Sequence, residues 1–350
     1  MMASLDTSVA ALRFSGTDRL AIEQIPVRAP GPGDVLVRPV AVGVCGTDLH
    51  IIKGHFPARP PVVLGHEIAA IVDLVGSDVT NVRPGDLVTI EPHKYCRTCR
   101  YCRSGREHLC VEKLAFGIHL DGGLAEAMTV PAANAYRLPP GTNPDLGCLV
   151  EPLACAVHGI EQLEPVSGNS ALVFGAGVAG CLLVGLARLH GLSPIVVVEP
   201  LEERRTRALS FGADAVFDPA TDGWLDDALA LTPDGFDRVV DAVGSAELLA
   251  LGVRAAARGA RILAYGVADS SEVLAVHPYE LFVRELSIVG SVTNPYTHQR
   301  AIDLLPRMSL ERLVITPFAL SDFQQALDGH VAGRLGKVVI RPQAYGELTA

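Results

Sequence analysis

The stretch ALVFGAGVAGCLLVGLARL, residues 171–189, decides the fold of the second half of the chain. An apolar run comes first, the glycines Gly175, Gly177 and Gly180 follow, and an apolar helix-like segment ends the stretch. Glycines at this spacing, between a strand and a helix, are the fingerprint of a dinucleotide site, because they let the backbone approach a pyrophosphate at a helix N-terminus. We therefore expect a strand over 171–174 and a helix over 178–190.

The same stretch is also the only candidate for a membrane span. It is uncharged from Ala171 through Ala187, which is borderline for crossing a bilayer. A second apolar run, IVVVE (195–199), follows it directly, as in a buried parallel sheet. We expect no membrane span.

Strand-like and helix-like segments continue to alternate after residue 190. The alternation predicts an α/β, doubly wound parallel sheet. Its further expected elements are strands 194–199, 214–217, 237–244, 260–266 and 286–292, and a helix over 202–212. Glu199 ends the second strand about twenty residues after the glycines, where an acidic side chain accepts hydrogen bonds from the adenosine ribose.

The first half of the chain has a different texture. Short strands broken by Gly and Pro, at 35–44, 66–76 and 86–92, predict an irregular, mainly-β unit. After residue 295 come an amphipathic helix (321–330) and a final strand (336–340). We expect a catalytic domain over 1–160, a dinucleotide-binding domain over 161–294, and a C-terminal segment, 295–350, that returns to the first domain.

Composition excludes several classes of protein. The 350 residues are 49% hydrophobic and 19% charged, which is typical of compact globular chains. A net charge of -10 disfavours nucleic acid and anionic lipid as partners. The first residues, MMASLDTSVAALRF, lack the features of a secretory signal, so we expect a cytoplasmic protein whose thiols bind metal or act in catalysis.

The segment CRTCRYCRSGREHLC (96–110) holds half of the eight cysteines. Four thiolates this close together can wrap one zinc ion or an iron–sulfur cluster. The local fourth cysteine, with no Pro after it, favours zinc. The neighbouring arginines would offset the negative charge of a zinc tetrathiolate.

A second group of metal-ligand types is spread over three segments. These are VCGTDLH (44–50), GHE (65–67) and LVEPLACAVHG (149–159). One Cys, one His and one or two carboxylates from separate segments describe an open zinc site with room for a substrate.

Together these motifs resemble the zinc-dependent medium-chain alcohol dehydrogenases over nearly the whole chain. CGTDLH, GHE, the four-cysteine segment, EP at 151–152 and GAGVAG at 175–180 stand in that family's order. The likeness is strongest to the polyol (sorbitol and arabitol) types, with threonine dehydrogenase a near relative. It implies a GroES-like catalytic domain, two zinc ions per chain and NAD.

The resemblance also implies roles for individual residues. The catalytic zinc would be held by Cys45, His66, Glu67 and Glu151, the last directly or through water, and the structural zinc by Cys96, Cys99, Cys102 and Cys110. Thr47 would contact the substrate oxygen, His50 would relay its proton, and Asp48 would support His66. The residues expected to contact NAD are Gly175, Gly177, Val178, Gly180, Glu199 and Arg204.

The expected reaction is NAD-dependent oxidation of a secondary alcohol or polyol, within a homo-oligomer (tetramer or dimer). Oxidation of an amino alcohol such as threonine, a non-catalytic nucleotide-binding protein and an iron–sulfur carrier are the alternatives. Thr293 and Asn294 stand where sorbitol-type enzymes carry an Arg and a Tyr, which argues against sorbitol. His93 is expected at the surface or the pocket mouth. Arg204 and Arg205 are expected more than one turn beyond the strand that ends at Glu199, paired with nearby acids.

Overall fold

The computed structural model describes residues 4–17, 19–333 and 335–343, which form two compact units. The first unit comprises the chain up to Pro152 and from Val314 onward, and the second comprises Leu153–Leu313. The sequence had placed these divisions at residues 160 and 294. Helix α4 (Val150–Gln162) crosses the first division, and Thr297 Oγ1 donates to Ala154 O at 2.7 Å, so the segment after 294 still packs within the second unit.

The second unit is built on a six-stranded sheet, in which every pairing among the described residues is parallel. Its order is β13-β12-β11-β14-β15-β16. The strands are β11 (Ala171–Phe174), β12 (Ile195–Val198), β13 (Ala215–Phe217), β14 (Phe236–Asp241), β15 (Ala256–Ala264) and β16 (Ser287–Gly290). The direction of winding reverses between β11 and β14, which is where such sheets bind ligands. The expected doubly wound sheet is confirmed.

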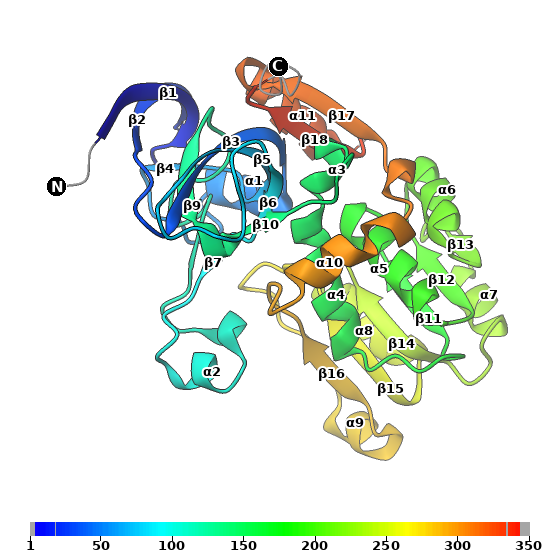
Figure 1. Ribbon diagram of the computed structural model, residues 1–350. Helices are drawn as coiled ribbons and strands as arrows, with labels where there is room; N and C mark the ends of the chain where they lie inside the picture. The colour runs from blue at the N-terminus through cyan, green and yellow to red at the C-terminus, as the bar shows by residue number, and fades with distance from the viewer. Residues whose placement is uncertain (1–3, 18, 334, 344–350) are drawn as a thin grey trace. The chain divides into compact units, whose positions relative to one another are not determined.

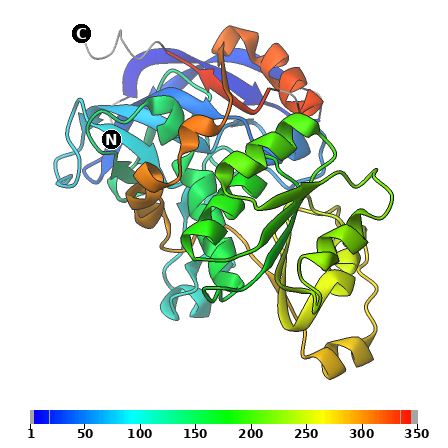
Figure 2. The same ribbon diagram turned by 90° about the vertical axis from the view of Figure 1, so that its right-hand side faces the viewer.

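Helices cover both faces of this sheet; in Figure 2, α4 and α5 (green) lie on one side and α7 and α8 (yellow-green) on the other. The further helices are α5 (Val178–Leu189), α6 (Glu202–Phe211), α7 (Trp224–Ala230), α8 (Ala246–Ala255), α9 (Pro278–Arg284) and α10 (His298–Leu304). Helix α5 is buried almost throughout, which explains its apolar sequence. None of the helices in the described part of the chain has the length and hydropathy that crossing a bilayer requires.

The first unit is mainly β, as expected. A seven-stranded sheet runs β10-β6-β5-β3-β18-β17, with β9 also paired to β3, and a three-stranded sheet runs β2-β1-β4. Their strands are β1 (Ser4–Phe14), β2 (Leu20–Arg28), β3 (Asp34–Gly43), β4 (Val62–Val63), β5 (Glu67–Val75), β6 (Leu87–Ile90), β9 (Met128–Pro131), β10 (Ala135–Arg137), β17 (Ile315–Ala319) and β18 (Lys337–Arg341). Strand β18 pairs antiparallel with β3, so the end of the chain completes this core.

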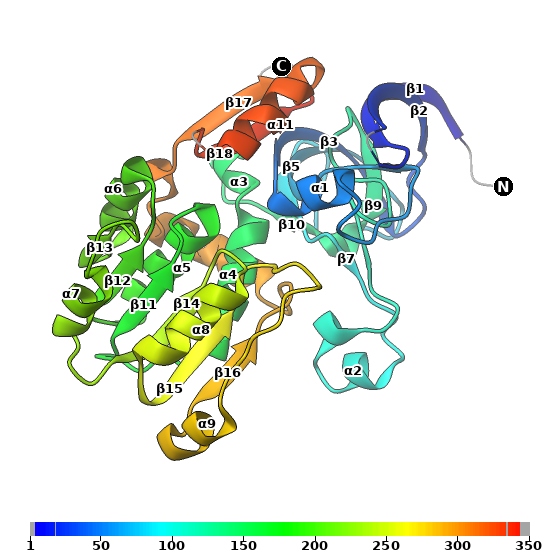
Figure 3. The same cartoon turned by 180° about the vertical axis from the view of Figure 1, so that it is seen from behind.

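Short elements link these sheets. The helices of the first unit are α1 (Gly46–Ile52), α2 (Arg100–Arg103), α3 (Pro144–Gly147) and α11 (Phe323–Ala332). The 3-10 turns of the chain are Glu107–Leu109, Ala132–Asn134, Leu305–Arg307, Leu310–Arg312 and Leu320–Asp322. Between β7 (His93–Lys94) and β8 (Leu114–Ala115), the cysteine segment forms a lobe that projects from the rest of its unit (Figures 1 and 3).

Candidate active site

Three metal-ligand side chains meet in the first unit. Cys45 precedes α1, while His66 and Glu67 lie at the start of β5. One ligand atom from each lies within 4.8 Å of the others, and His66 and Glu67 are buried. A thiol, an imidazole and a carboxylate are the ligand types that zinc prefers in catalytic sites, so these residues fit the metal. We call them the metal group.

Asp48 ties two members of the metal group together. One carboxylate oxygen accepts from Cys45 N at 2.9 Å, and the other lies 3.5 Å from His66 Nδ1. Burial opposes the charge of Asp48, but its interactions with His66, the hydrogen bond from Cys45 N and the charge of Lys337 together outweigh burial and lower the pKa of Asp48. In the metal-free protein burial likewise opposes the charge of His66, and Asp48 raises its pKa well above the usual value. The pair therefore orients the imidazole, as expected for a ligand's supporting carboxylate.

Lys337, on β18, is a member of this site that the sequence did not reveal. Its ammonium forms a buried ion pair with Glu67 and donates to Val44 O at 3.0 Å. Burial raises the pKa of Glu67, and the Lys337 charge opposes that rise. A Cβ atom at Gly43, which stands opposite Glu67 in the β3–β5 register, would overlap the Glu67 carboxylate. In the sequence, the only signal for Lys337 was its place at the start of a strand whose next three residues are apolar.

The structure places the other expected catalytic residues as follows. Thr47 Oγ1 lies 3.6 Å from Cys45 Sγ, at the edge of the metal group. His50 lies half-buried in the last turn of α1, and its ring centroid is 6.4 Å from that of His55. Glu151, near the start of α4, is buried and its charge also raises the pKa of Glu67, but it does not belong to the 4.8 Å group.

The four cysteines of the projecting lobe form a second metal-ligand cluster, with their sulfurs within 4.8 Å of one another. Cys99 N lies 3.3 Å from Cys96 Sγ, and Cys96 N lies 3.4 Å from Cys110 Sγ. Hydrogen bonds from Thr98 lower the pKa of Cys96 to about 6, which favours its thiolate, whereas burial and hydrogen bonds to the other cysteines raise the pKa of Cys102 to about 12. The Tyr101 ring carries the Arg100 and Arg106 guanidinium groups at 5.2 and 5.6 Å.

The glycine segment forms the turn from β11 into α5. Gly175 has a φ of +90°, which side chains other than glycine rarely adopt, and a Cβ atom at Gly180 would overlap the Gly175 carbonyl. Gly177 caps α5 and Val178 begins it. This helix start lies at the switch point of the sheet, the place where doubly wound sheets bind a pyrophosphate.

Glu199 does more in this turn than the sequence predicted. Its carboxylate is buried and accepts from Ala176 N at 2.8 Å and from Leu201 N at 3.0 Å. Both oxygens thus hold the backbone around the cofactor turn, and any ribose contact uses the remaining lone pairs.

The side chains of the two arginines that follow reach back to the strand end. Helix α6 begins at Glu202, so both are in its first turn. Arg204 Nη1 lies 3.7 Å from Glu199 Oε2, and Arg205 Nη1 donates to Glu199 O at 2.8 Å and pairs with Asp218 at 3.0 Å. The expected pairing with acids holds, and α6 begins at Glu202 as expected; both side chains nevertheless reach back to Glu199 at the end of β12.

Asp241, at the end of β14, was missed. Its buried carboxylate accepts backbone N–H groups from Val243 at 2.9 Å, Gly244 at 3.0 Å and Ser245 at 2.8 Å. A Cβ atom at Gly175 would crowd the Val243 side chain, so this turn lies directly beside the glycine turn. The signal that could have identified Asp241 was an acidic residue at a second strand end, besides Glu199.

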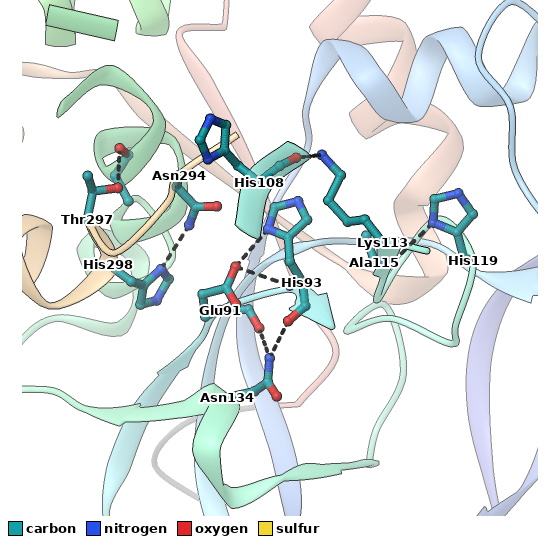
Figure 4. Close-up of polar contacts among 11 residues, drawn as sticks. Glu91, His93, His108, Lys113, Ala115, His119, Asn134, Asn294, Thr297 and His298 are labelled. Atoms are coloured by element: carbon teal, nitrogen blue, oxygen red, sulfur yellow. Dashed lines mark hydrogen bonds and ion pairs between the residues drawn. The ribbon is translucent and has the colours of Figure 1, made fainter. Parts of the chain in front are cut away.

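Among the polar contacts drawn in Figure 4 are one around His93 in the first unit and one around Asn294 in the second. His93 was expected at the surface or the pocket mouth, but it is buried, and its Nδ1 lies 2.7 Å from Glu91 Oε1. In the second unit, buried Asn294 lies 3.4 Å from His298 Nδ1 through its amide nitrogen. Asn294 is therefore held inside its own unit by a histidine.

Comparison with known proteins agrees with this geometry. The protein family described as "Alcohol dehydrogenase GroES-like domain" matches residues 31–140, and the family described as "Zinc-binding dehydrogenase" matches residues 179–308. L-threonine 3-dehydrogenase of Pyrococcus abyssi is 32% identical over 95% of this chain and 97% of its own length. The chain belongs to the zinc-dependent medium-chain alcohol dehydrogenase family.

Other relatives show the range of this dehydrogenase family. D-arabinitol dehydrogenase 1 of Uromyces fabae is 30% identical over 97% of this chain and 99% of its own length. A protein from Sinorhizobium meliloti 1021, solved with NADP bound, is 34% identical and superposes with a TM-score of 0.92 over 96% of this chain and 100% of its own. A protein from Escherichia coli CFT073, solved with NADH, is 27% identical with a TM-score of 0.89, covering 97% and 100%. The expected family, fold and oxidoreductase class are confirmed.

Proposed function

We propose that this dehydrogenase transfers a hydride between a secondary alcohol or polyol and NAD. The observation that carries the proposal is the metal group, in which a thiol, an imidazole and a carboxylate meet within 4.8 Å beside the Thr47 hydroxyl. Oxidation of an amino alcohol, as the name L-threonine 3-dehydrogenase of a relative suggests, is the second candidate.

We assign the following roles to the chain's own residues, supported by their positions. Cys45, His66 and Glu67 would hold a zinc ion, with Glu151 contributing directly or through water. Zinc bound there acts as a Lewis acid that makes a substrate hydroxyl more acidic. The Thr47 hydroxyl would take up the substrate proton while giving its own proton onward, and His50 would take up the relayed proton and release one to solvent. Asp48 keeps the His66 ring oriented through its 3.5 Å contact.

The second zinc ion would lie in the cysteine lobe and serve structure. Four thiols leave no ligand position open, so the site contributes folding free energy and no chemistry. Iron in its place would give visible absorption, whereas the zinc enzyme is colourless.

We further propose that the enzyme prefers NAD over NADP. Glu199 places a negative charge at the strand end, where a 2'-phosphate would have to lie. Its neighbour Arg204 contributes the opposite charge at 3.7 Å and limits that preference. Similar proteins have been solved with NADP and with NADH.

The ratio of kcat/KM values for the two cofactors tests this preference. Wild type should favour NAD by at least about tenfold, and Glu199→Gln should lose much of that preference. Arg204→Gln is the matched variant and should lower use of NADP further. A wild-type preference for NADP would mean that the arginines decide specificity.

The protein is proposed to be a cytoplasmic homo-oligomer, a tetramer or a dimer. Strand β16 lies at the edge of its sheet, with one side unpaired in the described chain. Phe282, on the preceding helix α9, has 81% of its surface exposed. An edge strand beside exposed apolar side chains is a surface that a second copy of the chain would cover.

Metal analysis and an NADH assay together test the proposed reaction. The purified protein should hold about two zinc ions per chain. A panel of polyols, secondary alcohols, diols and L-threonine, followed by NADH absorbance, should give turnover with at least one class. His66→Ala should abolish turnover and leave NADH binding nearly unchanged. If His66→Ala also loses NADH binding, the assignment of His66 to the metal site is contradicted.

A further inference from the structure

A buried lysine lies among the metal ligands of the first unit. Lys337 is the first residue of β18, and only 3% of its side chain is exposed. Its ammonium contacts Glu67 Oε2 and donates to Val44 O at 3.0 Å. Because Val44 directly precedes Cys45, this one side chain connects the segments that carry two of the three members of the metal group.

The backbone fixes where this ammonium lies. Val44 N donates to Val338 O at 3.0 Å, and β18 pairs antiparallel with β3. Gly43, on β3, stands opposite Glu67 in the pairing of β3 with β5. A Cβ atom at Gly43 would overlap both the Lys337 side chain and the Glu67 carboxylate, so the two side chains meet directly over this glycine.

Stability alone does not account for a charged pair at this place. The strand β18 is already held by its backbone pairing and by Val338 and Ile340, which belong to the apolar core. A buried ion pair contributes little net stability compared with well-packed apolar side chains, because both charges lose their water. We therefore looked for the role of Lys337 in the metal group that it contacts.

The charges of the metal group indicate what such a cation does. Burial opposes the charge of Lys337, but the charges of Glu67, Cys45 and Cys148 and the hydrogen bond to Glu67 outweigh burial and raise the pKa of Lys337. The side chain is therefore an ammonium ion. A thiolate and a carboxylate would together cancel the charge of a zinc ion, whereas an ammonium beside the carboxylate offsets part of that negative charge.

We propose that Lys337 is a positioning residue that holds Glu67 Oε2 away from the metal, so that Glu67 offers the ion one oxygen and no more. With Cys45 and His66 this makes three protein ligands and leaves a position for the substrate oxygen, as catalytic zinc sites require. Lys337 acts through Glu67 and touches neither substrate nor metal. This inference rests on the proposed function, because it concerns the same metal group.

The rate of zinc release to a chelator tests this role in Lys337→Met. Methionine keeps the length of the side chain without its charge, so both Glu67 oxygens become free to bind the ion. Release from the metal group should slow by at least about tenfold, which is the size of effect that partners of metal ligands have. A purely structural lysine predicts the opposite, because a destabilised site loses its metal faster.

Two controls accompany the release measurement. Lys94→Met should release zinc at the wild-type rate, since Lys94 is an exposed lysine of the same unit. Release from the cysteine lobe, followed as a separate phase, should be the same in all three proteins. Unchanged or faster release from the metal group of Lys337→Met would overturn the proposal.

Cobalt in place of zinc reports the number of ligands. Cobalt binds the same nitrogen, oxygen and sulfur ligands, and its visible absorption weakens when a fifth ligand joins four. Lys337→Met should lose part of the absorption that wild type and Lys94→Met share, because Glu67 then binds through both oxygens. The lobe contributes equally to each spectrum. Identical spectra for the three proteins would contradict the proposed role.

Melting temperatures with and without zinc cover the case in which the metal-free variant does not fold. Without metal, Lys337→Met leaves the Glu67 carboxylate buried without a cation, which is costly. With zinc bound, the ion takes the place of the ammonium as the partner of Glu67. The loss of melting temperature should therefore be large in the metal-free variant and small in the zinc-loaded one. An equal loss in both forms, or failure to fold with zinc present, would count against the proposal.

These readouts need no turnover, which separates the inference from the proposed function. Where a substrate is found, kcat of Lys337→Met should also fall by about tenfold or more, because the second Glu67 oxygen fills the substrate position. If zinc release and the cobalt spectrum change as expected but wild type oxidises no alcohol, only the proposed reaction fails. If wild type turns over and Lys337→Met releases zinc like Lys94→Met, the reaction stands and the role of Lys337 is overturned.

Discussion

Single buried carboxylates organise the loops of this enzyme. Asp48, Glu199 and Asp241 each accept backbone N–H groups at the start or end of a regular element. A buried N–H group without a partner costs about 1–3 kcal/mol, so such residues are expensive to remove. Their charge also attracts the functional groups around them, as Asp48 attracts His66.

Asp241→Ala tests this role at the dinucleotide turn. The variant leaves three backbone N–H groups without their acceptor, so we expect the free energy of unfolding to fall by at least about 2 kcal/mol. NADH binding, measured by fluorescence, should weaken as Val243 moves against the glycine turn. Glu272→Ala is the control, because Glu272 accepts a single N–H, from Ala246, at the surface. Equal effects of the two variants would contradict the role of Asp241.

The His66 proton predicts how zinc uptake depends on pH. In the metal-free protein Asp48 raises the pKa of His66 well above the usual value. Below that raised pKa the metal must displace the proton, so zinc affinity should fall by about tenfold for each pH unit lost at this group alone. Competition with a chelator between about pH 5.5 and 8 measures it. Asp48→Asn should move the decline to lower pH, and an affinity that does not vary with pH would exclude this coupling.

At the scale of elements, the sequence predicts what periodicity and turns encode. Strands β11 and β12 and helix α5 lie within a residue or two of their expected bounds, because apolar runs and glycines mark them. The spacing of Cys96 to Cys110 likewise predicts their cluster. Lys337 could not be predicted as a site residue, since its partner Glu67 lies far away in sequence and it belongs to no motif. Only the folded chain brings the two together.

Gly43→Ala tests the packing of β3 against β5 and β18. The added Cβ would overlap the Glu67 carboxylate, which cannot move away without breaking the ion pair with Lys337. We expect the free energy of unfolding to fall by about 3 kcal/mol and the catalytic zinc to be lost. Gly46→Ala is the matched control, because its Cβ would meet no atom within 4 Å. Thermal unfolding and metal analysis measure both, and a stable Gly43→Ala with full zinc would contradict this account.

At the scale of the whole molecule, the edge of the second unit's sheet is the feature that bears on association between copies of the chain. Strand β16 ends the sheet of the second unit, and helix α9 carries apolar side chains outward beside it. The proposed homo-oligomer would extend the sheet across this edge.

Phe282→Lys should weaken that association. Light scattering at micromolar concentration should show an oligomer for wild type and a lower mass for the variant, because a lysine would have to be desolvated in an apolar contact. Val166→Lys is the control on the same unit, since Val166 is 60% exposed and distant in sequence from β16. A monomeric wild-type protein would contradict the proposed homo-oligomer.

The ion pair between Glu67 and Lys337 also bears on how the protein is made. A ribosome releases the second unit, Leu153–Leu313, as one uninterrupted stretch, whereas the first unit remains incomplete until β18 has been synthesised. Domains usually fold in the order in which they emerge. Here the nucleotide-binding half can mature while the earlier half waits, with Glu67 lacking its cation. The nucleotide-binding unit of the nascent chain is therefore complete before the metal group has its Lys337 partner.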